Sequence, residues 1–447
     1  MSSQCAAPPG ISNTALVLYK DILSRSALLT GTYPFRMGRQ NGPIGDNQPT
    51  GLTLDKTLLP EYLKTKGYAT HMIGKWHLGF CKREYLPTNR GFDSHYGYWS
   101  GAEDYYTKMI GPPGNQGYDF YDGEEVDRSA AGTYSTDLYT DRAKSIIATH
   151  AAKDGDHPLF LYVAYQATHT PLAAPQKFQD LYPDMKDQDR MMFSAAASAL
   201  DESVGDITQA LVDHGLYDNT VIVFMGDNGG QTGNHGGGNN YPLRGMKGTT
   251  WEGGVRTPAF IHSPLLGAGG VSIDQLIHVT DWLPTFMKAA GATDEEIAAM
   301  EVDGVDHWDI INDPENFVSR REDVVLNMRD APQGNHGPKG AYRKGEYKIV
   351  VHPSGQDGWI EPPTTDNNYS SVTHSNINAT ITKPQMYYLF NIKDDPEERK
   401  DLSQSQHHVL QEMREAFESI HEEMVPADDP EDESGGLQDG VWVTGWC

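Results

Sequence analysis

Residues 220–230 read TVIVFMGDNGG, an apolar run that ends abruptly in the oxygen-bearing side chains of Asp227 and Asn228. The same change occurs twice more: Leu159–Tyr165 is followed by QATH, and Tyr68–Ile73 is followed by GKWH. Short apolar runs rich in β-branched and aromatic residues are typical of strands covered on both faces. His71 interrupts the run at 68–73, so its strand signal is the weakest of the three.

Helical patterns separate these predicted strands. Residues 55–67, 137–150 and 190–216 alternate apolar and polar residues at helical spacing. The last pattern has one apolar stripe, formed by Leu200, Val204, Ile207 and Leu211. Strands that alternate with helices predict an α/β fold, with a mostly parallel central sheet flanked by helices.

Polar side chains follow the carboxyl end of each predicted strand, and in open α/β sheets ligands bind at that edge. We therefore expect five side chains to meet there: Lys75, His77, His169, Asp227 and Asn228. Because Lys75 and His77 are two residues apart, an extended backbone would point both the same way.

The chemistry of these residues suits a metal ion and an anionic substrate. Asp227 and Asn228 offer two oxygens to a hard cation such as Ca²⁺, which needs six or more, although the same residues also form ordinary turns. Lys75 and Lys247 could neutralise an oxyanion while a histidine protonates a leaving oxygen. The alternative for Lys247 is a solvated lysine in a glycine-rich loop.

A second, smaller unit is predicted from about residue 336. Residues 341–351 read as a hairpin around Gly345, 387–392 as a strand and 404–424 as a helix, with a long loop at 353–383. This pattern predicts a small α+β module with an antiparallel sheet. The expected division is 1–23, 24–335 for the main domain, 336–425 for the module, and an acidic tail at 426–447.

Composition limits the partners. The chain has 447 residues and a formal charge of −27, from 62 acidic and 35 basic residues, so nucleic acid is not an expected partner. The acidic run at 426–433 is predicted to be solvated. No apolar run reaches the roughly 18 residues of a membrane span. The N-terminal residues show no signal-peptide pattern.

The cysteines and sequons leave some questions open. Cys5, Cys81 and Cys447 allow one disulfide, but the sequence does not show which pair forms it. Asn368 and Asn378 begin Asn-x-Ser/Thr sequons, which matter only if the chain enters the secretory pathway.

The segment DILSRSALLTG at 21–31 reads as a short helix, with Ser24 as its N-cap and Gly31 just past its end. Arg25 adds a full positive charge to the N-terminal end of the helix dipole, which suits an anion. Asp21 stands three residues ahead of the predicted cap.

Together these segments resemble the sulfatase family, and most closely the arylsulfatase B type, which removes 4-sulfate from N-acetylgalactosamine units. The resemblance runs from about Ser24 to about Leu402. The stretches that carry it are SRSALLTG (24–31), HMIGKWHLG (71–79), LPTNRGFD (86–93), DNGGQT (227–232), PLRGMK (242–247), WEGGVR (251–256), DWLPT (281–285) and KDDPEER (393–399).

The resemblance implies an alkaline-phosphatase-like fold and a role for each site residue. Asp227 and Asn228 look like ligands of a catalytic Ca²⁺, Arg25 like the arginine that steadies the nucleophile, and Lys75 and Lys247 like sulfate contacts. His77 looks like the partner of the nucleophile, and His169 like the acid that faces the leaving oxygen. The implied substrates are aryl sulfates or sulfated glycans, and the implied location is lysosomal or secreted.

The sequence departs from the family pattern at its start. The family reads Cys-x-Pro-Ser-Arg, and its cysteine becomes the formylglycine whose hydrate attacks sulfur. Here Asp21 stands at the cysteine position and Leu23 at the proline position. Residues 1–20 contain no aspartate, so we also expect the family's first strand and its Asp-Asp metal ligands to be missing.

Three interpretations follow from these departures. The chain could be a truncated or mis-assembled form of a working sulfatase, because the match begins abruptly at Ser24. It could be a pseudoenzyme that keeps a cleft for sulfated glycans, although an unpaired buried sheet edge is costly. It could be a phosphoesterase that uses Asp21, although one carboxylate does not complete a metal shell.

Overall fold

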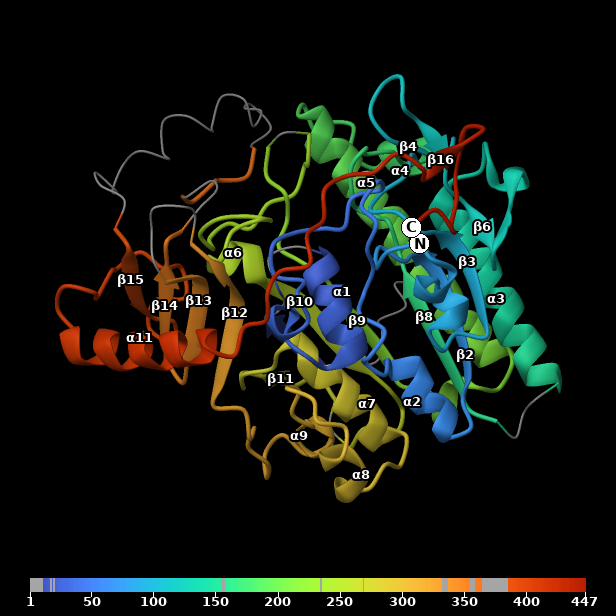
Figure 1. Cartoon of the computed structure of the whole chain (residues 1–447). Coiled ribbons are helices and arrows are strands. Elements are labelled where there is room, and N and C mark those ends of the chain that lie inside the picture. The colour runs from blue at the N-terminus through green and yellow to red at the C-terminus, as the bar shows by residue number, and fades with distance from the viewer. Residues whose placement is uncertain are drawn as a thin grey trace.

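The computed structural model describes residues 11–16, 18, 21–153, 157–233, 235–267, 269–331, 337–353, 358–363 and 385–447. Two larger sheets flanked by helices form most of the main domain, together with a small sheet of two-residue strands. A fourth sheet, with one long helix against it, lies at one side of the molecule (Figure 1). The predicted α/β class is confirmed, with a mixed arrangement of strands in place of a mostly parallel one.

The first sheet holds two of the three strands predicted from the apolar runs. Its order is β7 (Glu125–Val126), β6 (Tyr121–Asp122), β3 (Ser94–Tyr98), β2 (Ala69–Lys75) and β8 (Leu159–Ala164). β2 is parallel to both β3 and β8, as the α/β prediction requires. His71 fits within β2 because its Nδ1 lies 2.7 Å from the Ser94 hydroxyl.

The third predicted strand, β9 (Ile222–Met225), lies in a different sheet. The order of that sheet is β11 (Ser272–Ile273), β1 (Ile11–Leu16), β10 (Arg256–His262) and β9, with β10 antiparallel to both β1 and β9. We expected a missing first strand. Residues 11–16, within the segment placed outside the family domain, form β1 and pair with residues 256–261 of β10. Leu16 also forms an isolated bridge with His278.

β8 and β9 differ from the prediction in their burial. Both were expected to be covered on both faces, but most of their residues are only half-buried. Within the described chain, β8 pairs only with β2 and β9 only with β10, so each is the outermost strand of its sheet. An outermost strand leaves one row of backbone groups without a strand partner.

The first helix, α1 (Asp21–Thr30), begins three residues earlier than predicted. Ser24 is therefore not an N-cap. Its hydroxyl lies inside the helix and accepts a hydrogen bond from the Leu18 amide at 3.0 Å. The predicted end is confirmed, because Gly31 has φ +65°, a left-handed conformation that glycine adopts at low cost.

The other predicted helices are confirmed, as α2 (Leu59–Thr65), α3 (Ser135–Lys153) and α5 (Gln188–Asp213). The stripe predicted for α5 is shifted around the helix. Its buried face carries mainly small residues, namely Ala195, Ala196, Ala199, Ser203, Ala210 and Leu211. Leu200, Val204 and Ile207 are only half-buried. Small residues allow α5 to pack closely against α3.

The remaining described elements of the main domain are short. The strands are β4 (Met109–Ile110) and β5 (Gly117–Tyr118), and the helices are α4 (Gln176–Gln179), α6 (Glu252–Val255), α7 (Trp282–Ala289), α8 (Asp294–Ala298) and α9 (Trp308–Asn312). Single turns of 3-10 helix cover Pro34–Arg36, Arg83–Tyr85, Pro87–Asn89, Arg128–Ala130, Tyr217–Asn219 and Val279–Asp281.

The C-terminal module has the predicted hairpin, sheet and helix. Its antiparallel sheet runs β12 (Asp323–Asp330), β13 (Pro338–Lys344), β14 (Tyr347–Val351) and β15 (Tyr387–Asn391), and α11 (His407–His421) packs against it. Gly345, at φ +57°, lies in the tight turn between β13 and β14. The sheet includes β12, which lies before the boundary predicted at residue 336.

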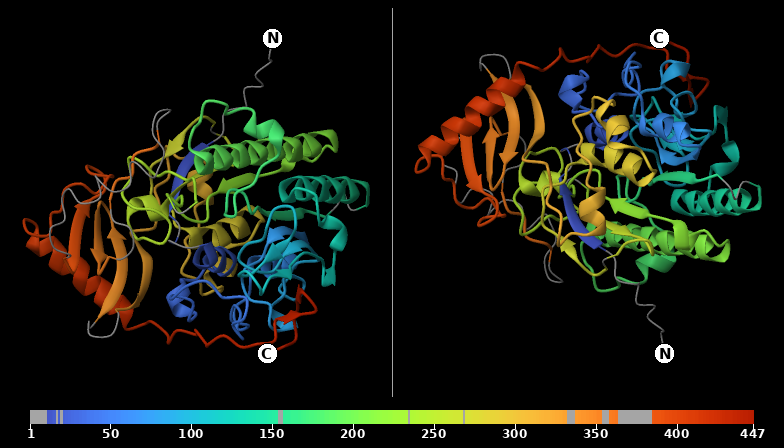
Figure 2. Two further views of the ribbon diagram at one scale, coloured as in Figure 1. Left: turned by 90° about the horizontal axis from the view of Figure 1, so that it is seen from above. Right: turned by 90° about the horizontal axis from the view of Figure 1, so that it is seen from below.

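The last residues return to the main domain, as the red segment in Figure 2 shows. The acidic run at 426–433 is mostly exposed, and Asp428 pairs with Arg39. Beyond it, β16 (Leu437–Gln438) and β17 (Val441–Trp442) join β5, with Trp442 buried. A disulfide joins Cys447 to Cys81, which answers the question of cysteine pairing.

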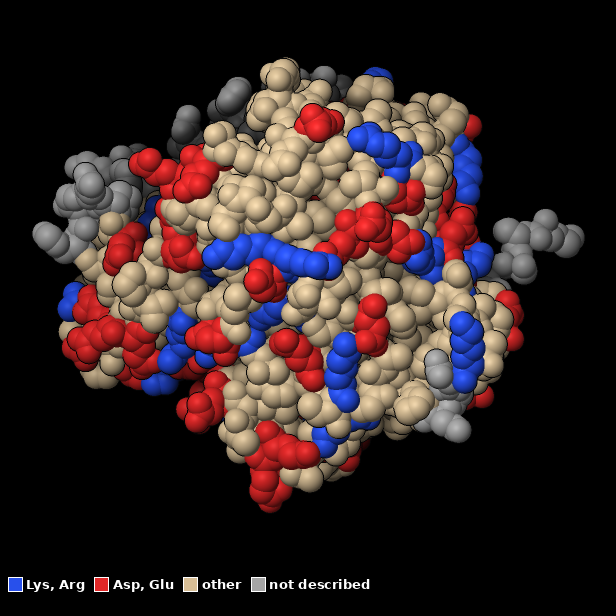
Figure 3. All heavy atoms as spheres, turned by 45° about the vertical axis from the view of Figure 1, so that its right-hand side comes forward, with Lys and Arg blue, Asp and Glu red and all other residues tan. Residues whose placement is uncertain are grey.

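The surface is consistent with the charge analysis. Lysine and arginine are interspersed with aspartate and glutamate on the face in Figure 3 and do not gather into one large basic patch there. None of the helices in the described chain combines the length and apolarity needed to cross a bilayer.

A buried ion-pair cluster joins the C-terminal sheet to the main domain. Lys348 of β14 lies 2.8 Å from carboxylate oxygens of both Glu252 in α6 and Glu398, and all three side chains are fully buried. Burial raises the pKa of Glu398 to about 7, against the opposing effect of Lys348. Nearby, the Arg244 guanidinium lies 3.6 Å from the centre of the Trp251 ring.

We predict that Glu398→Gln flattens the dependence of stability on pH. Because the pKa of Glu398 is raised in the folded state, its contribution to stability is complete below about pH 4.5 and is lost as pH rises towards 7. Wild-type midpoints of denaturant unfolding should therefore fall more between about pH 5.5 and 8 than those of the variant.

The matched control is Glu346→Gln at an exposed ion pair with Lys393. Lys393 lowers the pKa of Glu346, so this group stays ionised across the same pH range. Equal slopes for wild type and Glu398→Gln would show that Glu398 does not hold a proton in the folded chain.

Candidate active site

Arg25 lies at the centre of the site, on the first turns of α1. Its side chain is only 7% exposed. The guanidinium donates to the Lys75 carbonyl at 3.0 Å and to the Tyr162 hydroxyl at 3.4 Å, and pairs with an Asp227 oxygen at 3.3 Å. A buried guanidinium needs such partners because losing its hydration is costly. Arg25 thus joins the ends of β2 and β9 and the middle of β8.

Lys75 is the last residue of β2, and His77 lies two residues beyond it. The extended backbone on which we based a shared direction of the two side chains is not kept at His77, which has φ +56°, in the left-handed region. A non-glycine residue pays about 1–2 kcal/mol for this conformation, which is common at functional sites. The His77 amide donates to Trp99, and its ring lies against Gly101, where a Cβ would approach Nε2 to 2.8 Å.

His169 lies beyond β8 in a short turn, where its amide donates to the Gln166 carbonyl at 2.7 Å. The ring Nδ1 lies 2.7 Å from the Thr170 carbonyl oxygen. Because a carbonyl only accepts, this contact assigns a proton to Nδ1, and Nε2 is the other ring nitrogen that can carry one. The Tyr105 hydroxyl donates to the His169 carbonyl at 3.1 Å.

Asp227 and Asn228 form the turn after β9. Gly229 fixes this turn against α6, because its amide donates to Gly254 at 2.9 Å and a Cβ there would lie 1.9 Å from the Gly253 carbonyl. The Asp227 side chain is 38% exposed. The Asn228 side-chain oxygen is buried without a hydrogen-bond partner in the described chain.

Lys247 comes from the glycine-rich loop that leads into α6. Its amide donates to the Gly230 carbonyl at 3.2 Å, three residues after Asp227, and its side chain is half-buried. The contacts therefore place Lys247 beside the Asp227 turn and place Arg25 between that turn and Lys75. His77 and His169 are connected to one another through the segment that carries Gly101 and Tyr105.

Three of the predicted positions lie wholly or partly outside the described residues. The backbone of Asp21 begins α1, but its side chain is among those not described, and the sequons at Asn368 and Asn378 fall in 364–384.

Sequence reasoning missed Tyr162 because it lay within an apolar strand with no sign that its hydroxyl meets an arginine. It also missed a buried pair within the 100–119 segment, in which Glu103 and Lys108 both contact the Ser135 hydroxyl, at 2.8 and 2.7 Å. Burial raises the pKa of Glu103 to about 8 and lowers the pKa of Lys108 to about 8. No local motif marks either residue.

Comparison with known proteins gives the family. The sulfatase family model matches residues 22–292, more than half of the chain. Arylsulfatase J of Mus musculus is 39% identical over 438 residues, covering 94% of this chain and 71% of the mouse protein. Arylsulfatase A of Bos taurus is 30% identical over 418 residues, covering 89% of this chain and 76% of the bovine protein.

A solved structure shares the fold. Ps i-CgsB, in complex with k-i-k-neocarrahexaose, aligns with a TM-score of 0.77 and 27% identity, covering 94% of this chain and 87% of that one. This chain belongs to the sulfatase family, as its motifs predicted. The arylsulfatase B type stays a prediction.

Proposed function

We propose that this chain carries the sulfate-ester cleft of a sulfatase and that, with the sequence given, it binds such esters but turns them over slowly or not at all. The observation that supports binding is the buried Arg25, which holds the Lys75 end of β2 and the Asp227 turn together beside Lys247. Arginine and lysine around one position suit an oxyanion in a chain that is acidic elsewhere.

The proposed substrates are aryl sulfates or the sulfate esters of glycans such as glycosaminoglycans. The arylsulfatase relatives support the first class, and the carrageenan oligosaccharide bound to Ps i-CgsB supports the second. The preference for N-acetylgalactosamine 4-sulfate follows from the arylsulfatase B resemblance alone.

We assign the site residues as follows. Lys75 and Lys247 neutralise the sulfate, and Arg25 steadies the nucleophile position at the start of α1. When the sulfur–oxygen bond breaks, His169 gives a proton from Nε2 to the leaving oxygen, while its Nδ1–H stays on the Thr170 carbonyl. His77 is assigned to the nucleophile. These roles come from the family pattern, and the strand-end positions support them.

The weak step is the nucleophilic attack. An aspartate at position 21 is not converted to formylglycine, so the aldehyde hydrate that attacks sulfur in this family is not formed there. A sulfate ester that binds to Lys75 and Lys247 would then meet cations and an acid but no activated nucleophile. We therefore assign binding, rather than turnover, as the main property of the chain as written.

A calcium ion fits the residues only in part. The buried Asn228 oxygen, which has no hydrogen-bond partner in the described chain, and the Asp227 carboxylate are oxygen ligands of the kind that Ca²⁺ prefers. However, the described residues include no group of three or more His, Cys, Asp or Glu side chains able to hold a metal. When bound, Ca²⁺ would supply positive charge to the sulfate. We propose that Asp227 and Asn228 hold it weakly.

A lysosomal or secreted location is also proposed. The Cys81–Cys447 disulfide supports it, because disulfides persist in oxidising compartments.

The first test is the hydrolysis of a chromogenic aryl sulfate by purified chain beside a His169→Ala variant. We predict equal, negligible turnover by the two proteins. Without an activated nucleophile to attack sulfur, the acid His169 has no leaving oxygen to protonate, so its removal should change nothing. Matching far-ultraviolet spectra and thermal midpoints would verify that both proteins are folded. Wild-type turnover clearly above that of His169→Ala would refute the proposed impairment.

The second test is a calorimetric titration with Ca²⁺. We predict a dissociation constant weaker than about 10⁻⁵ M, because two protein oxygens make a small part of a shell of six or more. Asp227→Asn should weaken binding further, whereas Asp439→Asn on the exposed turn between β16 and β17 should not. Submicromolar binding would show that another group completes the shell.

A further inference from the structure

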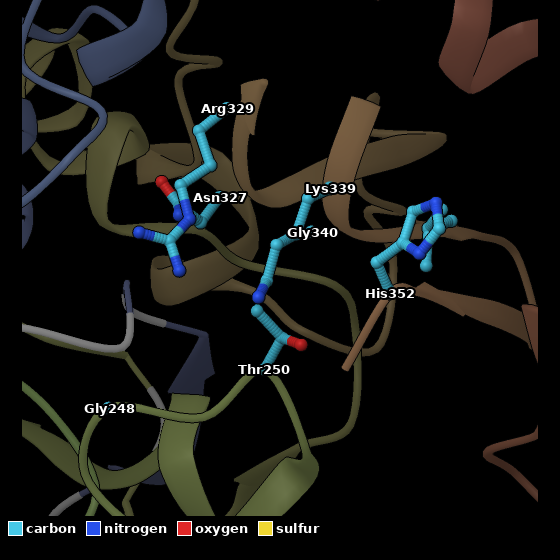
Figure 4. A pocket seen from close by; sticks show the side chains of 8 residues that line it. Gly248, Thr250, Asn327, Arg329, Lys339, Gly340 and His352 are labelled. Atoms are coloured by element: carbon cyan, nitrogen blue, oxygen red, sulfur yellow. The ribbon is translucent and has the colours of Figure 1, made fainter. Parts of the chain in front are cut away.

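Three basic side chains lie side by side across the C-terminal sheet. Arg329 of β12 and Lys339 of β13 are cross-strand partners. On the next strand, β14, Val351 pairs with Gly340 of β13, and His352 directly follows Val351. All three are half-buried. With Gly248, Thr250 and Asn327 they line a small hollow (Figure 4). In that view, Arg329 and Lys339 extend towards the loop that carries Gly248 and Thr250.

No carboxylate neutralises these side chains in the described part of the chain. Neither Arg329 nor Lys339 forms an ion pair or a side-chain hydrogen bond there, and the neighbouring Asp330 pairs with His421 instead. Like charges directly opposite on adjacent strands are destabilising. This arrangement is unexpected in a chain with 62 acidic residues.

The electrostatics of the hollow agree with the geometry. Burial and the charge of Arg329 lower the pKa of Lys339. Burial and the charge of Lys339 lower the pKa of His352. Arg329 thus raises the cost of charging Lys339, and Lys339 raises that of charging His352. An anion placed among them would offset that cost.

The backbone beside the hollow is shaped by a bulge. The β12–β13 register shifts between Val325 and Met328, and Asn327 has φ +76°. Gly340, the partner of Met328, must be a glycine, because a Cβ there would lie 1.9 Å from the Asn327 carbonyl. Bulges increase local twist and redirect side chains, and they are frequent next to functional sites.

The hollow borders the candidate active site through one loop. Gly248 and Thr250 line it, and Gly248 directly follows Lys247, whose amide is bonded to Gly230. Successive Cα atoms are about 3.8 Å apart, so the backbone that lines the hollow at Gly248 lies one residue from Lys247.

We propose that Arg329 and Lys339, aided by His352, form a second anion subsite that binds a sulfate on a sugar adjacent to the one whose sulfate lies at Lys247. The ligand is a glycan with at least two sulfate groups. This inference rests on the proposed function, because it places the first sulfate at Lys247. A guanidinium offers a planar pair of donors to two sulfate oxygens, and an ammonium adds a point charge.

The test is calorimetric binding of two chondroitin tetrasaccharides that differ only in whether a second 4-sulfate is present. Wild type should bind the disulfated ligand at least about tenfold more tightly, in line with one charge-assisted bidentate contact. The double variant Arg329→Gln, Lys339→Gln should lose this preference and keep its affinity for the monosulfated ligand. The control Lys344→Gln, on the same strand but exposed and paired with Glu412, should behave as wild type.

Other results would overturn the inference in distinguishable ways. Equal binding of the two ligands by wild type, or an unchanged preference in the double variant, refutes the subsite but leaves the proposed function standing. Binding of neither ligand refutes both. A further outcome is that inorganic sulfate binds at Arg329 and Lys339 with a free energy equal to the gain that the second 4-sulfate gives the tetrasaccharide. This would show a site for the free anion only and would refute the glycan assignment.

Stability without ligand gives an independent check. Replacing two opposed cations by glutamine should leave the thermal midpoint of the double variant equal to or above that of wild type. A clear fall in the thermal midpoint, with Lys344→Gln unchanged, would mean that Arg329 and Lys339 already have a stabilising partner. This would refute the proposal that their charges are left for an anionic ligand.

Discussion

The burial of one guanidinium organises the site. The Arg25 side chain is only 7% exposed, and a carbonyl, a phenol and a carboxylate help to stabilise its buried charge. These three partners come from β2, β8 and the turn after β9, which belong to two different sheets. The position of Lys75 relative to Asp227 therefore depends on Arg25, and so does the cleft between them.

A second buried basic residue, Lys348, joins the C-terminal module to the main domain. Lys348 is buried between two carboxylates, one from α6 and one from the module, so the sheet is held against the loop that carries Lys247. That placement brings Arg329 and Lys339 to the loop that carries Gly248 and Thr250. Two buried basic residues thus place the cationic groups of two regions in one area of an otherwise acidic protein.

Much of this architecture could be predicted from sequence because it depends on local patterns. Apolar runs gave β2, β8 and β9, and the turn at Gly345 gave the hairpin. What failed depends on contacts between distant segments. The His77 amide meets the Trp99 carbonyl, and β9 pairs with β10, so both depend on partners well beyond the local pattern. The start of α1 also differed, because Ser24 lies inside the helix rather than at its cap. Tyr162 and the Lys348 cluster carry no local signal, because their partners lie 137 and 96 residues away in sequence.

The most direct test of this account is hydrogen–deuterium exchange of Arg25→Lys against wild type, both without ligand. Lysine keeps the charge but not the planar set of donors, so it cannot hold all three partners together. The account predicts faster exchange in peptides from both sheets, covering 71–79 and 222–230, with no change in β12–β14 of the C-terminal sheet. Faster exchange confined to α1, or equal exchange throughout, would contradict the claim that Arg25 holds the two sheet ends in one site.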